Sequence, residues 1–155
     1  MIVRFKSTII NHQSKIYMAY LVGHFDKCTG CVICQLACSA REHNGYNPRL
    51  ANLDIKMSED GLTHFPVVCH QCENAFCERV CPVSAISRSE KTGALVVDKK
   101  VCTGCELCID ACPIGMIWMV GKKAQKCDLC DGEPQCVSLC PVEALELVAR
   151  REVAE

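Results

Sequence analysis

Sixteen cysteines dominate the chemistry of this sequence, and they fall into four groups of four with none left over. Each group occupies one short run, and three of the runs continue with proline directly after the last cysteine. The groups are Cys28, Cys31, Cys34 and Cys38; Cys69, Cys72, Cys77 and Cys81; Cys102, Cys105, Cys108 and Cys112; and Cys127, Cys130, Cys136 and Cys140. Sulfur ligands in this density indicate a metal protein or a disulfide scaffold.

The spacing within the runs favours cubane iron–sulfur clusters. Three cysteines that are two residues apart can wrap one loop around three irons, and the fourth iron then takes its ligand from elsewhere. The run that ends at Cys112 matches the bacterial ferredoxin pattern, in which the fourth cysteine binds the neighbouring cluster of a pair. Zinc sites use separated Cys-x2-Cys pairs instead of four crowded cysteines. We therefore predict four [4Fe–4S] clusters.

Two arrangements are possible for the clusters that the fourth cysteines of the runs bind. Either the first run pairs with the second and the third with the fourth, or the second and third form a module nested inside one made from the first and fourth. Between the second and third runs lie a Cys-Pro turn at Cys81, a short strand, a turn at Gly93 and a strand at 94–97, which form a compact hairpin linker as in a two-cluster ferredoxin. The linker between the first and second runs lacks that Cys-Pro turn, and the linker between the third and fourth runs is short. Both therefore resemble connections between modules.

The nested arrangement is therefore our prediction, and it assigns every ligand. The four predicted ligand sets are Cys28, Cys31, Cys34 and Cys140; Cys69, Cys72, Cys77 and Cys112; Cys102, Cys105, Cys108 and Cys81; and Cys127, Cys130, Cys136 and Cys38.

Short elements must position these loops. Proline after Cys81, Cys112 and Cys140 ends the preceding helical turn, whereas the first run continues as a helix that stops near Gly45. Strands are predicted at 53–57 and 62–68, on either side of a turn at 58–61, and at 94–97 and 145–148.

The predicted fold class is α+β, with two nested bacterial-ferredoxin-like modules of short strands, short helices and cluster-binding loops. The predicted divisions are an N-terminal extension at 1–19, a four-cluster polyferredoxin domain at 20–148 and a charged tail at 149–155. Module A takes 20–40 and 113–148, module B takes 66–112, and 41–65 form an insertion. The extension either contacts a partner protein or a second copy of the chain, or covers the chain's own fold.

Composition adds further bounds. Aromatic residues make up 5 % of the 155 residues, so the core is thin and the metal-free chain should be largely unfolded.

The start lacks a signal-peptide pattern, so a cytoplasmic location with reduced thiols is expected. The best uncharged run, 16–25, is too short to cross a bilayer, and no direct membrane insertion is expected. Nucleic-acid binding is not expected either, since iron-bound thiolates make the chain acidic.

The sequence contains no glycine-rich nucleotide motif and no nucleophile with a base, so we predict an electron carrier without catalysis of its own. His70, inside the second run, either tunes a potential through a hydrogen bond to sulfur or is an ordinary loop residue. Lysines near the runs either offset the charge of the clusters or form a solvated face: Lys99, Lys100, Lys122, Lys123 and Lys126.

At these runs the sequence resembles the iron–sulfur subunits of the dimethyl sulfoxide reductase family, which are four-cluster ferredoxin-like proteins. The resemblance covers about residues 20–148. It rests on the three Cys-Pro pairs and on the segments 27–31, 37–39, 69–73, 102–105 and 126–130. One departure is Phe76, where the family usually has proline, but the ligand Cys77 is kept.

The resemblance implies a wire between a catalytic subunit and a second redox partner. The catalytic subunit would hold molybdenum or tungsten or be a hydrogenase, and the second partner would be a flavin subunit or a ferredoxin. Small size and the lack of an export signal or anchor favour the type found with cytoplasmic tungsten aldehyde oxidoreductases. The alternatives are a formate dehydrogenase or hydrogenase subunit, or a freely diffusing polyferredoxin. A metal-storage protein would not explain the paired runs.

Overall fold

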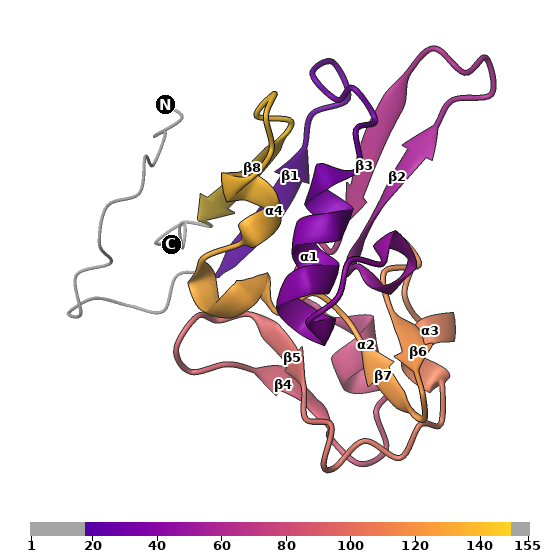
Figure 1. Ribbon diagram of the computed structural model, residues 1–155. Helices are drawn as coiled ribbons and strands as arrows, with labels where there is room; N and C mark the ends of the chain where they lie inside the picture. The colour runs from indigo at the N-terminus through magenta and orange to yellow at the C-terminus, as the bar shows by residue number, and fades with distance from the viewer. Residues whose placement is uncertain (1–17, 150–155) are drawn as a thin grey trace.

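The computed structural model describes residues 18–149 of the chain (Figure 1). The predicted N-terminal extension, apart from Met18 and Ala19, and the predicted tail, apart from Ala149, lie outside the described residues.

Short elements alternate along the described part. The strands are β1 (Ala19–Gly23), β2 (Leu53–Met57), β3 (His64–Val68), β4 (Ile86–Arg88), β5 (Leu95–Val97), β6 (Trp118–Val120), β7 (Lys123–Gln125) and β8 (Leu145–Ala149). The helices are α1 (Ile33–His43), α2 (Phe76–Arg79), α3 (Leu107–Asp110) and α4 (Gln135–Ser138), with 3-10 turns η1 (Pro48–Leu50) and η2 (Leu129–Gly132). This confirms the predicted mixture of short strands, short helices and loops.

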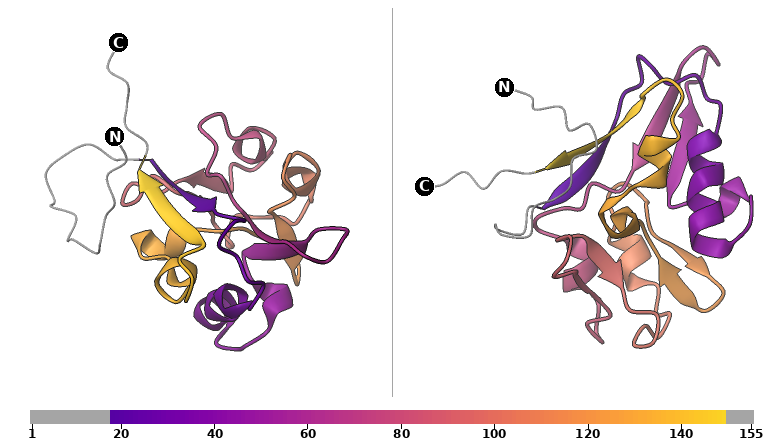
Figure 2. Two further views of the ribbon diagram at one scale, coloured as in Figure 1. Left: turned by 90° about the horizontal axis from the view of Figure 1, so that it is seen from above. Right: turned by 60° about the vertical axis from the view of Figure 1, so that its left-hand side comes forward.

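Antiparallel pairing joins the strands of residues 18–149 in four pairs: β1 with β8, β2 with β3, β4 with β5, and β6 with β7. Three of these are local hairpins. The pair β1–β8 instead joins the two ends of the described chain, with Ala19 opposite Ala149 and Gly23 opposite Leu145. The indigo and yellow strands lie side by side in both views of Figure 2.

Helix α1 is the one long helix among the described elements. It ends at His43 and is capped by Asn44, whose backbone φ of 52° is left-handed and whose N–H donates to the carbonyl oxygen of Ala40 at 3.0 Å. This agrees with the predicted stop near Gly45. Cys34 and Cys38 lie on its buried face, and the helix packs against α4 and β2.

The core consists largely of small residues and cysteine sulfur. One group of buried residues gathers around β1, α1, β2 and β8, and a second around β4, β5 and β7. Partly buried Cys112 packs against both groups. No helix of residues 18–149 has the length and apolar character that crossing a membrane requires.

Strand prediction was accurate where a hairpin is local. β2 has the predicted bounds, β3 starts two residues later, β5 starts one residue later, and β8 is one residue longer. β4 agrees with the short strand predicted before the turn at Gly93, for which no bounds were given, whereas β1, β6 and β7 were not predicted. β6 and β7 have only three residues each, which is too short for an alternating pattern to stand out.

Candidate metal centres

Each cysteine run bends through a left-handed residue just before its second cysteine. The backbone φ is 71° at Gly30, 47° at Gln71, 75° at Gly104 and 60° at Leu129. Only glycine adopts this conformation without cost. Non-glycine residues there cost about 1–2 kcal/mol each. Strain of this kind persists where the surroundings hold it in place, and it gathers at functional sites.

A second left-handed turn follows each Cys-Pro pair. The third residue after the cysteine has a φ of 50° at Ser84, 65° at Gly115 and 50° at Glu143. This turn brings the next backbone N–H back to the cysteine sulfur, because the chain reverses within one residue.

Backbone N–H groups consequently donate to the last cysteine of three runs. The distances from N to Sγ are 3.2 Å from Ala85 to Cys81, 3.3 Å from Met116 to Cys112 and 3.2 Å from Ala144 to Cys140. Cys38 has no proline after it, and its sulfur accepts from the N–H of Asn52 at 3.1 Å instead. Hydrogen bonds of this type favour thiolate over thiol and tune iron–sulfur centres.

The first run meets the end of the last one. Cys28, Cys31, Cys34 and Cys140 line one hollow. The pKa of Cys34 is raised to about 11, mainly by burial and in smaller part by the neighbouring sulfurs of Cys140, Cys31 and Cys28. Three sulfurs of the first run and one sulfur of the fourth run therefore line the same hollow.

Cys38, the last cysteine of the first run, lies in turn near cysteines of the fourth run. The pKa of the Cys38 thiol is raised to about 12, mainly by burial and in smaller part by Cys130. Burial also raises the pKa of Cys136, and its sulfur neighbours are Cys38, Cys130 and Cys34. The pKa of buried Cys127 is raised by burial and then by Cys69.

The second and third runs form the remaining groups. Burial raises the pKa of Cys77, and the nearby sulfurs of Cys69 and Cys112 add to the rise. Burial likewise raises the pKa of Cys108, with contributions from Cys102, Cys105 and Cys81. The short helices α2 and α3, which carry the third cysteine of each run, contact each other.

No disulfide joins any of the sixteen cysteines, and only Cys31 and Cys105 are exposed. Within residues 18–149 no three His, Cys, Asp or Glu side chains converge closely enough to hold one metal ion, which is how zinc would be held. The ligands of a cubane cluster can lie farther apart, since each of its irons takes one thiolate. Buried sulfurs that accept backbone N–H groups suit iron–sulfur ligation, and iron binding would convert these thiols to thiolates.

The other residues that were singled out near the runs differ in their exposure to solvent. Lys99, Lys100 and Lys122 are exposed and Lys123 is half-buried, but Lys126 is buried. His70 and Phe76 are exposed. Two further residues near the sulfurs were not predicted: Asn52, which donates to Cys38, and Gln71, which bonds both Cys127 and Leu95 from inside the second run. No local motif signals either residue.

Two family models match the chain. One, described as a 4Fe-4S dicluster domain, matches residues 61–150, and one described as a 4Fe-4S binding domain matches residues 25–41. The chain is similar to the putative electron transport protein YsaA of Escherichia coli, with 38 % identity over 120 residues that cover 72 % of this chain and 75 % of YsaA.

A second relative comes from Pyrococcus furiosus. The polyferredoxin-like subunit of an aliphatic sulfonate oxidoreductase is 38 % identical over 112 residues, which cover 70 % of this chain and 64 % of that subunit. In fold the chain is similar to a chain of the active site complex BamBC of benzoyl coenzyme A reductase. The TM-score is 0.52 at 24 % identity, over 91 % of this chain and 83 % of that chain.

These similarities agree with the grouped sulfurs and the small sheets. Relatives of the chain are named as a putative electron transport protein and as a polyferredoxin-like subunit of an oxidoreductase. The chain itself belongs to the 4Fe-4S dicluster domain family.

Proposed function

We propose that the chain holds four [4Fe–4S] clusters in two nested modules and passes electrons along them between a catalytic subunit and a second redox partner. When bound, each cluster would take up and release one electron. The observation that carries the proposal is the reciprocal meeting of the first and last runs. Cys140 shares a hollow with Cys28, Cys31 and Cys34, while Cys38 neighbours Cys130 and Cys136.

The proposed ligand sets follow the nested arrangement. Each set takes three cysteines from one run and one cysteine from the partner run. They are Cys28, Cys31, Cys34 and Cys140; Cys127, Cys130, Cys136 and Cys38; Cys69, Cys72, Cys77 and Cys112; and Cys102, Cys105, Cys108 and Cys81. The sulfur neighbours of Cys34, Cys38, Cys77 and Cys108 support this assignment.

An order for the wire follows from contacts between the groups. Cys34 neighbours Cys136, which supports placing the first and fourth runs next to each other. Cys127 neighbours Cys69 and thereby links the fourth run to the second. The contact between α2 and α3 continues the path to the third run.

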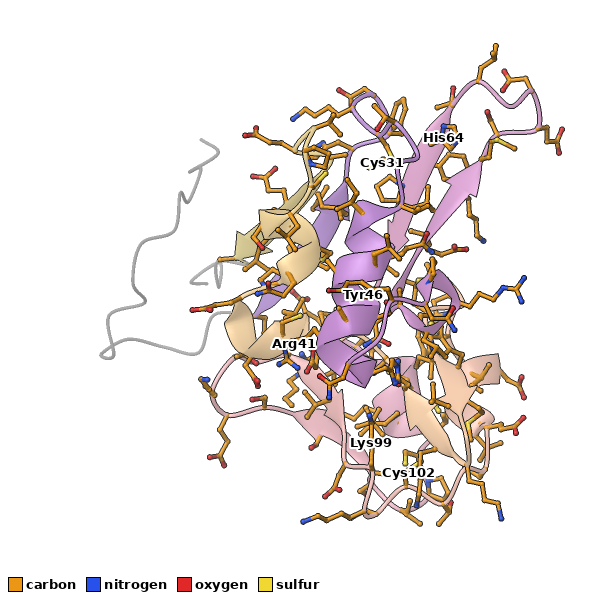
Figure 3. All side chains as sticks on the ribbon, viewed as in Figure 1. Cys31, Arg41, Tyr46, His64, Lys99 and Cys102 are labelled. Carbon is orange, nitrogen blue, oxygen red and sulfur yellow. The ribbon has the colours of Figure 1, made fainter. Side chains whose placement is uncertain are left out.

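Electrons would enter and leave at the two ends of this path. The exposed cysteines, Cys31 and Cys105, belong to the first and last groups of the order. Figure 3 shows Cys31 towards one end of the molecule and Cys102, from the same run as Cys105, towards the other. A redox partner at each end could therefore approach a cluster closely.

Our first choice of catalytic partner is a tungsten aldehyde oxidoreductase in the cytoplasm, and the second redox partner would be a flavin subunit or a ferredoxin. The role as a subunit is supported by the Pyrococcus furiosus relative, a polyferredoxin-like subunit of an oxidoreductase. A formate dehydrogenase, a hydrogenase or free diffusion remain alternatives. Residues 1–19 would contact the catalytic subunit or a second copy of the chain.

Iron and sulfide analysis of anaerobically purified chain tests the cluster count. We expect about sixteen of each per chain, as four cubane clusters require, with visible absorption that bleaches on reduction. Iron near eight per chain, or stoichiometric zinc, would refute the proposal. Native complexes can then be isolated by size exclusion and the co-purifying subunit assayed for tungsten.

A further inference from the structure

Lys126 is a buried charge in the middle of the molecule. Its side chain is 5 % exposed, just after β7 and next to the first cysteine of the fourth run. The ammonium Nζ donates to the carbonyl oxygen of Leu95 in β5 at 2.6 Å and to that of Cys127 at 3.0 Å. Among the ion pairs of residues 18–149, none involves Lys126.

A buried ammonium without a carboxylate is unfavourable unless other negative charge surrounds it. Two carbonyl dipoles are its direct partners here. Lys126 directly precedes Cys127 of the fourth run, and Gln71 of the second run bonds Leu95 and Cys127, which are the two residues that Lys126 bonds. Iron-bound thiolates in these two runs would supply the missing negative charge.

We propose that Lys126 is a fixed positive charge that raises the reduction potentials of the two clusters held by the second and fourth runs. This inference rests on the proposed function, because it needs clusters in those runs. Reduction adds one electron from the redox partner to a cluster and neither makes nor breaks a bond. A nearby positive charge favours the reduced form, since net charge around a cluster helps to set its potential.

Rigid placement makes this charge effective. Gln71, which is 1 % exposed, accepts from the N–H of Leu95 at 2.8 Å and donates to the carbonyl oxygen of Cys127 at 2.8 Å. Gln71 and Lys126 thus bond the same two residues, one with a neutral amide and one with a charge. Lys123 is a half-buried lysine that donates to the carbonyl oxygen of Cys102.

These neighbours provide matched controls. Lys126→Met removes charge and hydrogen bonds, Lys126→Gln removes the charge but keeps a donor, and Gln71→Met removes hydrogen bonds to the same residues without a change of charge. Lys123→Met removes a more solvated lysine near the third run, where water screens the charge.

The test is a redox titration of the anaerobic full-length chain at fixed pH, followed by electron paramagnetic resonance, with iron content measured first. We expect both Lys126 variants to keep full iron and to lower two of the four midpoint potentials. The expected change is at least tenfold in the reduction equilibrium, about 59 mV for one electron. Gln71→Met and Lys123→Met should each shift the potentials less than Lys126→Met does.

Three results would overturn the inference. Unchanged potentials in the fully loaded Lys126 variants would remove the role of the charge. Equal shifts in Gln71→Met and Lys126→Met would assign the effect to hydrogen bonding. Loss of iron from both Lys126 variants would assign the residue to assembly. If the unaltered chain itself lacks four clusters, the proposed function fails instead.

Discussion

Replacing Cys140 by alanine distinguishes the nested arrangement from the sequential one. In the nested arrangement Cys140 completes the cluster of the first run, whereas in the sequential one it would complete the cluster of the third. We expect Cys140→Ala to lose one to four of about sixteen irons, because one cubane of four is left with three protein ligands. The freed cysteines should then be Cys28, Cys31 and Cys34.

Alkylation of the native protein with iodoacetamide, followed by peptide mass spectrometry, identifies the freed run. Cys31 is exposed and should react first. Cys34 should react slowly, because burial raises the pKa of its thiol and leaves little of it as thiolate. Cys31 should therefore be labelled before Cys34, because Cys34 is buried.

Cys112→Ala is the matched control. Each of the two replacements also removes one bond from a backbone N–H to sulfur, from Ala144 in one case and from Met116 in the other. That loss is about 1 kcal/mol in each, so it cannot account for a difference between them. Cys112→Ala should free the second run, at Cys69, Cys72 and Cys77. Labelling of Cys102, Cys105 and Cys108 after Cys140→Ala would refute the nesting.

Two further predictions concern the loops and the metal. Gly104→Ala should lower iron loading and thermal stability more than Gly115→Ala. Both glycines have positive φ, but a Cβ at Gly104 would collide with the carbonyl oxygen of Lys122, whereas nothing lies within 4 Å of one at Gly115; equal losses would contradict this reasoning. Gly115→Ala should cost about 1–2 kcal/mol from backbone strain alone. Removal of iron by an anaerobic chelator should abolish most secondary structure in far-ultraviolet circular dichroism, and a chelated chain with an unchanged spectrum would show that packing alone maintains the fold.

The cysteine spacing predicted the kind of fold well because each run encodes its own loop. The insertion hairpin was equally accessible, since β2 and β3 face each other across a short turn. β1 could not be recognised in the same way. Its partner β8 is at the far end of the described chain, and strand formation depends on cross-strand neighbours more than on intrinsic preference.

The surroundings of the sulfurs were the least predictable part. Asn52 donates to Cys38 through its backbone N–H, and a backbone group has no sequence signature. Lys126 was a candidate for a solvated face because lysine is rarely buried, and its neighbours Lys122 and Lys123 are indeed more exposed. The burial of Lys126 comes from the packing of β5 against the fourth run, which local sequence does not reveal.

The pairing of β1 with β8 sets an order for biosynthesis. β1 leaves the ribosome before all the other described elements and β8 after them, so this sheet cannot close until β8 has been made. The hairpins β4–β5 and β6–β7 join neighbouring segments, and such local contacts form soonest. Until translation reaches Leu145, β1 presents an unpaired edge that favours association with other strands. A nascent chain stalled before β8 should therefore need protection by a chaperone.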